Sequence, residues 1–366
     1  MPLPDLPRIG VRLHGGLAPR RCIELAQIVE ANGFASLWFA ENPFHRGVLP
    51  AVSACVAATR RIHIGIGVVN PYSRHPSLIA MEFAALDELA QGRALLGIGP
   101  GIGAQIERMG FKYRPLATMQ DAVHIVRAML RGDTVTYRGP VFSVEAVALG
   151  FRPLRPDLPI YMAAMGDRSL ELCGRIADGL IVSNMCPPAY TERAVGIVRR
   201  GAAGTPRDIA QPNIVQYVPA VIRPDRVEAR RAVKAAMGDM LAAFWPTNAA
   251  WPPVRDTIVR CSGIPKAEVM SALVRLRGGE SADAVLDDRY IDAFAIAGNA
   301  EDCLAQAMRY RHAGVAELAL TFAGDQPAID MAYFGAALRA CLRTRPLNSP
   351  PHRSVDERER YGEVGG

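Results

Sequence analysis

Short apolar runs alternate along the chain with longer segments in which apolar residues recur on one helical face. Eight runs predict β-strands: Ile9–His14, Ser36–Ala40, Ile62–Val69, Ala94–Ile98, Pro159–Met162, Gly179–Val182, Ile214–Val221 and Glu317–Phe322. The segments between them predict helices, the clearest being Pro19–Asn32, Pro76–Ala90, Met119–Leu130 and Ala300–Ala313. Near-continuous apolar strands between amphipathic helices are typical of a parallel sheet covered by helices.

The number of strands favours one parallel architecture over another. Eight strand–helix units are typical of a closed (β/α)8 TIM barrel, whereas an open sheet needs fewer. We therefore expect an α/β fold in which residues 1–344 form a single barrel domain. Residues 224–288 are too long for one connection and predict an insertion between strands seven and eight. Residues 345–366 are polar and proline-rich, which predicts a loosely held tail, and Asp133–Val144 predicts a small hairpin.

Composition and charge exclude several classes of protein. The hydrophobic fraction is 50%, and the net charge of +6 is spread among interleaved acidic and basic residues, which does not suit a nucleic-acid surface. Seven cysteines without a C-x-x-C pair favour reduced thiols over a disulfide or metal framework. No apolar run reaches the ~18 residues of a membrane span, and the N-terminus does not resemble a signal peptide. We expect a cytoplasmic homodimer that acts on a small-molecule substrate.

A glycine-rich segment follows the fourth predicted strand. From Gly99 it matches G-x-G-x-x-A, a weak dinucleotide-binding pattern. No acidic residue ends a strand about 20 positions later, because Asp121 begins a helix. The alternative is a glycine-rich exit from the barrel, where missing side chains let a flat ring approach the backbone.

Three further loops follow predicted strands, at the barrel face where side chains perform chemistry. The loop after the third strand offers Asn70, Arg74 and His75, although Pro76 also suits the start of a helix. Glu41 and Asn42 follow the second strand, where they either bind a ligand or cap the barrel. After the fifth strand, residues 163–166 are mostly small and precede a predicted helix. This pattern predicts either an anion-binding site at the helix N-terminus or an ordinary turn between strand and helix.

Several of these segments together resemble a known family. The chain is similar to the luciferase-like flavin/deazaflavin oxidoreductases, and most similar to their methylenetetrahydromethanopterin reductase-like branch. The resemblance runs from about Ile9 to Phe322 and rests on Phe34–Glu41, Gly65–Pro76, Leu86–Arg93, Leu96–Gly101, Tyr161–Ala164, Ala177–Leu180 and Gly298–Glu301. It implies a (β/α)8 barrel with an insertion before the last strand, in agreement with the pattern of apolar residues.

The resemblance also implies a cofactor site. The cofactor ring would lie near Glu41, Asn42, Gly67, Val68, Val69, Asn70 and Gly101, and its phosphate near Ala163, Ala164, Met165 and Gly166. A non-prolyl cis peptide is expected between Gly67 and Val68. The chain departs from the family at four positions: Glu41-Asn42 replace Asp-His, Ile102 replaces a carboxylate, and Arg12 replaces a glutamate. Glu41 and His75 are the remaining candidates for the catalytic acid or base.

These observations favour hydride transfer between a small organic substrate and a reduced deazaflavin (coenzyme F420) or FMN. The Asn70–Pro76 loop favours the deazaflavin, whose acidic tail would suit Arg46, Arg74 and Arg168. Three alternatives stay open: an FMN-dependent monooxygenase that uses oxygen, a flavin-free barrel that acts on a phosphorylated metabolite, and a flavin-binding protein without activity.

Overall fold

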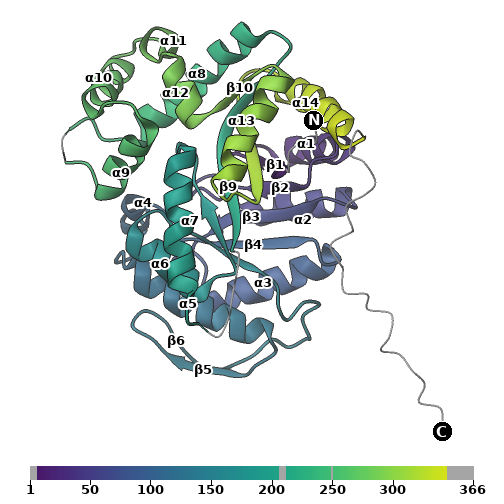
Figure 1. Cartoon of the computed structure of the whole chain (residues 1–366). Coiled ribbons are helices and arrows are strands. Elements are labelled where there is room, and N and C mark those ends of the chain that lie inside the picture. Colours follow the sequence, from purple (N-terminus) through teal and green to yellow (C-terminus); the bar gives the residue numbers. More distant parts are fainter. Residues whose placement is uncertain (1–5, 206–211, 249, 344–366) are drawn as a thin grey trace.

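A closed parallel barrel forms the centre of the molecule (Figure 1). The computed structural model describes residues 6–205, 212–248 and 250–343. Its barrel strands are β1 (Arg8–Leu13), β2 (Ser36–Phe39), β3 (His63–Val69), β4 (Ala94–Ile98), β7 (Ile160–Ala163), β8 (Gly179–Val182), β9 (Asn213–Ile222) and β11 (Glu317–Phe322). Each strand pairs with the next, β8 pairs with β9, and β11 returns to β1, so the sheet closes. The predicted (β/α)8 barrel is therefore confirmed.

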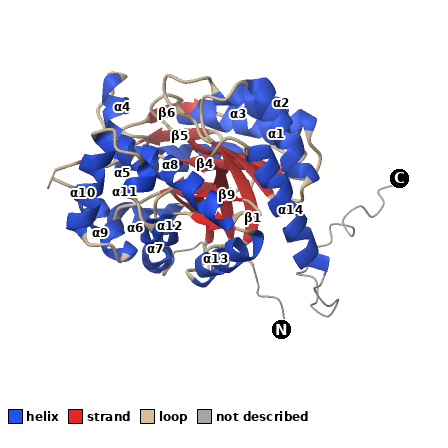
Figure 2. Cartoon of the chain, turned by 90° about the horizontal axis from the view of Figure 1, so that it is seen from above, coloured by secondary structure: helices blue, strands red, loops and turns tan. Residues whose placement is uncertain are grey.

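Helices surround the strands on the outside, as the view from above shows (Figure 2). They are α1 (Pro19–Ala31), α2 (Val48–Ala58), α3 (Pro76–Leu89), α5 (Pro115–Leu130), α6 (Asp167–Ile176), α7 (Pro188–Ala202), α13 (Ala300–His312) and α14 (Pro327–Arg343). Five of them begin with proline at the first helical position, where its fixed φ suits the helix and its missing N–H loses no hydrogen bond. Their apolar faces and the outward strand residues form one continuous core.

Short elements depart from the predicted repeat. The expected hairpin is present as β5 (Val135–Arg138) and β6 (Ser143–Val147), and it ends three residues later than Val144, the predicted limit. Strand β10 (Ile296–Gly298) pairs with β9 outside the closed ring, and helix α4 (Gly103–Arg108) follows β4. Neither was predicted, because three to six residues carry too little periodicity to be recognised.

Residues 224–288 hold a group of helices away from the barrel axis, at the upper left of Figure 1. They are α8 (Arg226–Phe244), α9 (Pro253–Ser262), α10 (Lys266–Arg277) and α11 (Ala282–Val285), and α12 (Asp288–Phe294) follows. The predicted tail, 345–366, lies outside the described residues, so the proposed division of the chain stays a prediction. None of the described helices has the length and hydropathy to cross a membrane.

Large aromatic side chains fill the barrel interior. The Trp38 ring meets Tyr161 edge-on at a centroid distance of 5.6 Å and Tyr217 at 6.3 Å. Glycines on the neighbouring strands make room for these rings. A Cβ atom on Gly65 would lie 3.0 Å from Trp38 Cε3, and one on Gly67 would lie 1.9 Å from the Tyr217 hydroxyl. The interior is thus a packed core whose glycines are dictated by their aromatic neighbours.

A buried carboxylate joins three strands near their N-terminal ends. Glu317 Oε1 accepts hydrogen bonds from Ser36 Oγ at 2.5 Å and Trp38 Nε1 at 2.7 Å. Its Oε2 lies 3.4 Å from Arg8 Nε. Since Glu317 retains only 4% of its exposure, these donors replace the water that a carboxylate otherwise needs. The cluster couples β1, β2 and β11 at the seam where the barrel closes.

All seven cysteines are free thiols. Cys22, Cys55, Cys173 and Cys303 are buried on α1, α2, α6 and α13, while Cys186 is buried after β8. Burial raises the pKa of Cys55 and Cys173 to about 12. In the folded protein these side chains therefore behave as small apolar residues.

Replacing Glu317 with glutamine should destabilise the fold. The variant keeps one acceptor but places an amide donor against Arg8, itself a donor, and removes the charge that Trp38 and Ser36 contact. We expect Glu317→Gln to lower the free energy of unfolding by about 1–3 kcal/mol, measured by urea denaturation. The exposed Glu88→Gln variant is the control and should change it by less than about 0.5 kcal/mol. Equal midpoints for the two variants would contradict the proposed role of the cluster.

Candidate active site

A cavity of about 420 Å³ opens at the C-terminal ends of the barrel strands. Residues from or just after β1, β2, β3, β4, β7, β8 and β9 converge on it, among them Arg12, Glu41, Asn42, Gly67, Val68, Asn70, Gly99, Gly101, Ala163, Ala164, Met165, Gly166, Ser183 and Tyr217. This is the face on which barrel enzymes carry their chemistry. The cavity therefore brings together nearly all the site residues predicted from the sequence.

Small residues line one wall of the cavity. The register of β3 against β4 shifts between Ile66 and Val69, and the expected cis peptide joins Gly67 to Val68. The Val68 and Ala163 side chains both lie against Gly99, since a Cβ atom there would lie 2.6 Å from Val68 Cγ2 and 3.2 Å from Ala163 Cβ. Such a wall can accept a planar ring without displacing a large side chain.

Glu41 belongs to a partly buried cluster of charges. Arg74 Nη1 donates a hydrogen bond to Glu41 Oε1, and Arg74 Nε lies 3.0 Å from Glu82 Oε2. One cation thus serves two carboxylates, and burial raises the pKa of Glu82 against the opposing effect of Arg74. Glu41 Oε2 is buried in the cavity wall without a hydrogen-bond partner among the described residues. Glu41 thus keeps one unused acceptor in the cavity wall.

Two predicted site residues lie apart from the cavity lining. His75 is the N-cap of α3: its Nδ1 accepts from the backbone N–H of Ser77 at 3.2 Å, and its ring meets Phe142 edge-on. The structure therefore gives His75 a capping contact and no contact with the cavity. Val69 is fully buried in the outer core, and its carbonyl accepts from Gly99 N–H at 3.0 Å. It supports the wall from behind.

Asn70 and Gly101 shape the cavity through local turns. Asn70 Oδ1 accepts from Ser73 N–H at 2.8 Å, which fixes the start of the loop after β3. Gly101 has a φ of 70°, a conformation that favours glycine, and its carbonyl accepts from the Tyr113 hydroxyl at 3.2 Å. Both contacts hold polar backbone at the mouth of the cavity in a defined position.

An uncapped helix N-terminus borders the other side of the cavity. Gly166 precedes α6, and no side chain caps the first turn of this helix. A Cβ atom on Gly166 would meet no atom within 4 Å, so the space beside it is open. Ser169, in the first turn, also lines the cavity. Free N–H groups at a helix N-terminus attract anions, which agrees with the predicted phosphate position at 163–166.

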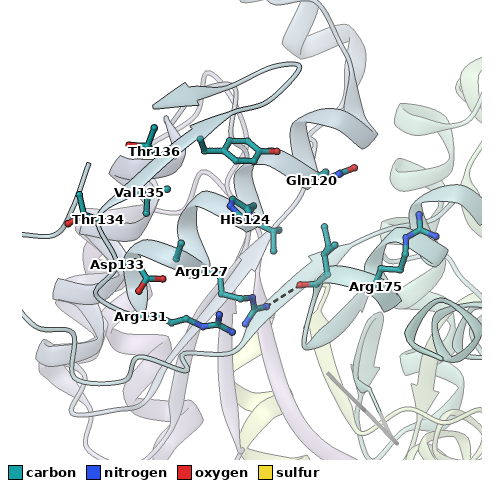
Figure 3. Close-up of a pocket in the computed structure, with 13 residues that line it drawn as sticks. Gln120, His124, Arg127, Arg131, Asp133, Thr134, Val135, Thr136 and Arg175 are labelled. Atoms are coloured by element: carbon teal, nitrogen blue, oxygen red, sulfur yellow. Dashed lines mark hydrogen bonds between the residues drawn. The ribbon is translucent and has the colours of Figure 1, made fainter. Parts of the chain in front are cut away.

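A larger cleft of about 850 Å³ lies elsewhere on the molecule (Figure 3). It is bordered by the C-terminal halves of α5 and α6 and by β5, and Arg127 donates across it to the Ile176 carbonyl at 3.1 Å. Since α6 ends where β8 begins, this cleft lies toward the N-terminal ends of the strands. That face usually serves stability. The smaller cavity is therefore the candidate active site.

Comparison with known proteins identifies the family. Residues 5–317 match the family described as Luciferase-like monooxygenase. The chain belongs to this family. Luciferase-like proteins are enzymes, and relatives of this chain by sequence are named as reductases and dehydrogenases.

Two luciferase-like relatives show how far the similarity extends. The 5,10-methylenetetrahydromethanopterin reductase of Methanolobus tindarius is 29% identical over 297 residues, which are 80% of this chain and 87% of the reductase. The F420-dependent glucose-6-phosphate dehydrogenase of Beutenbergia cavernae is 30% identical over 231 residues, 59% of this chain and 68% of the dehydrogenase. Among solved structures, the coenzyme F420 dependent tetrahydromethanopterin reductase of Methanopyrus kandleri superposes with a TM-score of 0.79, at 23% identity, over 90% of this chain and 98% of the reductase.

Sequence reasoning missed some residues of this luciferase-like cavity. Ser183 follows β8 and Tyr217 lies on β9, and neither residue was among the predicted site residues. Gln105 and Tyr113 come from the segment after β4, which showed only its glycines. A signal for Tyr217 was present, because side chains alternate between the two faces of a strand and Val215 and Tyr217 share the inward face.

Removing the cation of the charge cluster should make stability depend on pH. In Arg74→Met, Glu41 and Glu82 lose their counter-charge, which raises the folded pKa of Glu82 further. A carboxyl group with a raised folded pKa favours the folded state at low pH, and this contribution is lost as the pH rises through that pKa. We expect the variant to lose about 2–3 kcal/mol at about pH 8 and to recover much of it at about pH 5. Urea denaturation at both pH values measures this, and a pH-independent loss would contradict it.

Proposed function

We propose that this protein is a coenzyme F420-dependent oxidoreductase that transfers hydride between the cofactor and a small organic substrate. The observation that supports this most is the kinship: a relative named F420-dependent is 30% identical over 68% of its own length. Two relatives named as reductases, each aligned over 80% of this chain at 29% identity, also support an oxidoreductase. Because the family is one of enzymes, the alternative of a flavin-binding protein without activity is set aside.

The cavity fits such a cofactor. The wall formed by Val68, Gly99 and Ala163 suits a planar ring, and Glu41 Oε2 offers an unused acceptor beside it. The uncapped N-terminus of α6 suits the phosphate. We propose that Glu41, Asn42, Gly67, Val68, Asn70 and Gly101 border the ring and that Ala163, Ala164, Met165 and Gly166 contact the phosphate. Val69 would contribute only through its backbone.

The residues of the chain would position the reactants and handle the proton. A bound deazaflavin supplies hydride at a ring carbon and is nearly inert to oxygen. The wall of small residues would fix one face of the ring, which leaves the other face to the substrate. Glu41 would hold or release the proton at Oε2, since Oε1 is engaged by Arg74. His75 lies outside the cavity lining and is therefore not retained as a catalytic residue.

An FMN-dependent monooxygenase is the second candidate. The family description favours it, as does the superposition on the monooxygenase RslO1 of Streptomyces bottropensis, with a TM-score of 0.69 at 20% identity over 91% of this chain and 99% of that enzyme. The relatives named as reductases and dehydrogenases have higher identity, which favours the deazaflavin. A homodimer, a cytoplasmic location and the identity of the substrate stay predictions.

Cofactor titration distinguishes the two candidates. Purified protein is titrated with oxidised and reduced F420 and with FMN, at low and moderate salt, and binding is followed by absorbance. We expect F420 to bind at least ~10-fold more tightly than FMN, with an affinity that falls as salt rises because the cofactor is anionic. Tight FMN binding without F420 binding at low salt would favour the monooxygenase instead.

A substitution at Gly166 tests the phosphate position. An aspartate there meets no neighbouring atom and can cap α6, so the fold should keep or gain stability. Its charge would compete with the phosphate for the same N–H groups. We expect Gly166→Asp to weaken F420 binding at least ~10-fold, about 1.4 kcal/mol, and Gly166→Ala to have a smaller effect. Unchanged affinity in a folded Gly166→Asp variant would place the phosphate elsewhere.

A further inference from the structure

Arg12 brings a positive charge into the interior of the barrel. It lies on β1 at an inward position and lines the cavity. Its guanidinium carbon stands 5.0 Å from the centre of the Tyr217 ring, and its Nη1 lies 3.5 Å from Thr321 Oγ1. Tyr217 in turn donates to the Gly67 carbonyl at 3.4 Å. Arg12 is thus held over an aromatic ring beside the wall assigned to the cofactor.

This guanidinium has no counter-charge in the described part of the chain. None of the ion pairs within these residues includes Arg12, and its Nε is buried without a hydrogen-bond partner. Arg155 contacts Asp87, and Arg223 contacts Asp325 and Asp330. Arg93 and Arg255 also lack an ion pair but donate to backbone carbonyls. Among the described residues, the Arg12 side chain donates only to Thr321, and that contact is long.

An unpaired buried cation is costly to hold. Burial lowers the pKa of the Arg12 guanidinium, the direction expected when a charge loses water without gaining a partner. The nearby ring offsets part of this cost through a cation–π contact. Thr321 adds only a long contact with a neutral hydroxyl. Arg12 lines the cavity, and a planar anion is the ligand that a guanidinium fork matches best.

We propose that Arg12 binds the anionic group of the substrate, and that the substrates of this enzyme are organic carboxylates. The proposal rests on the proposed function and names its substrate class. Much of the remaining cavity lining is apolar, including Pro43, Ile102, Pro115 and Ile181. A carboxylate with an apolar body therefore fits both parts of the cavity, whereas a substrate without an anion leaves Arg12 unpaired.

Ligand binding to the protein loaded with F420 tests the proposal. The probes are acetate, benzoate and benzamide, which is close in shape to benzoate and uncharged. Binding is followed by the absorbance change of the bound cofactor and by calorimetry, so no turnover is needed. We expect saturable binding of benzoate, and binding of benzamide at least ~10-fold weaker.

Three variants assign the effect to Arg12. Arg12→Gln should weaken benzoate binding at least ~10-fold, change benzamide binding less than ~2-fold, and leave F420 affinity within ~2-fold. Arg12→Lys keeps the charge but loses the fork, so an intermediate loss is expected. Arg8→Gln is the matched control, because it removes the same charge from the same strand at the opposite end of the barrel. It should bind benzoate as the unmodified protein does.

Each other outcome overturns the proposal in a recognisable way. Failure of the unmodified protein to bind either carboxylate excludes a carboxylate site. An equal loss of benzoate and benzamide in Arg12→Gln assigns a packing role, and a loss of F420 affinity instead assigns the guanidinium to the cofactor. If Arg12→Gln does not fold, Arg12→Lys is tested in its place. Benzoate binding by Arg12→Lys that equals that of the unmodified protein then excludes the proposal. If F420 does not bind at all, the proposed function fails, and calorimetry with benzoate on the free protein still tests the carboxylate site.

Discussion

Closure of the barrel imposes the constraint on which the rest of the structure depends. Eight strands enclose a narrow interior that must be filled at one end to be stable and left open at the other to hold a ligand. Three aromatic rings, Trp38, Tyr161 and Tyr217, fill the interior, and Tyr217 also lines the cavity. Glycines oppose them because any larger residue would overlap the rings. Small residues then continue toward the open end, where they border the cavity.

Charge follows the same division of the interior. At the N-terminal end, Glu317 is surrounded by the donors of Ser36, Trp38 and Arg8, so it has a structural role. At the open end, Arg12 and Glu41 keep unsatisfied polar atoms at the cavity. A buried polar atom without a partner at the cavity gains one when a ligand binds, which favours binding at this end of the barrel.

The barrel could be predicted from the sequence because its strands are covered on both sides. Runs such as Ala94–Ile98 were located to the residue, since nearly every position in them is apolar. The three residues of β10 carry no comparable pattern. The C-terminal ends of the strands then placed Glu41, Asn70 and Ala163 at one face without further information.

The side chains of the site were harder to predict than their loops. His75 was selected for its ability to titrate near neutral pH, but the following Pro76 begins a helix and His75 becomes its N-cap. Arg12 interrupts an otherwise apolar run, a signal that the resemblance treated only as a departure from the family. Whether a strand residue faces the interior or the helices depends on the phase of the strand, and apolar runs conceal this phase.

The buried cysteines give this protein a set of natural reporters of local opening. Thiol reagents attack the thiolate, and a buried thiol whose pKa is raised to about 12 reacts slowly until local opening exposes it. Cys22 and Cys55 are placed to sense α1 and α2, Cys173 senses α6, and Cys303 senses α13. The labelling rate of each position would thus map the opening free energy around the ring, helix by helix, without any added probe. Comparison of Cys173 with the other three would show whether the helix beside the proposed phosphate position is the part of the ring that opens most readily.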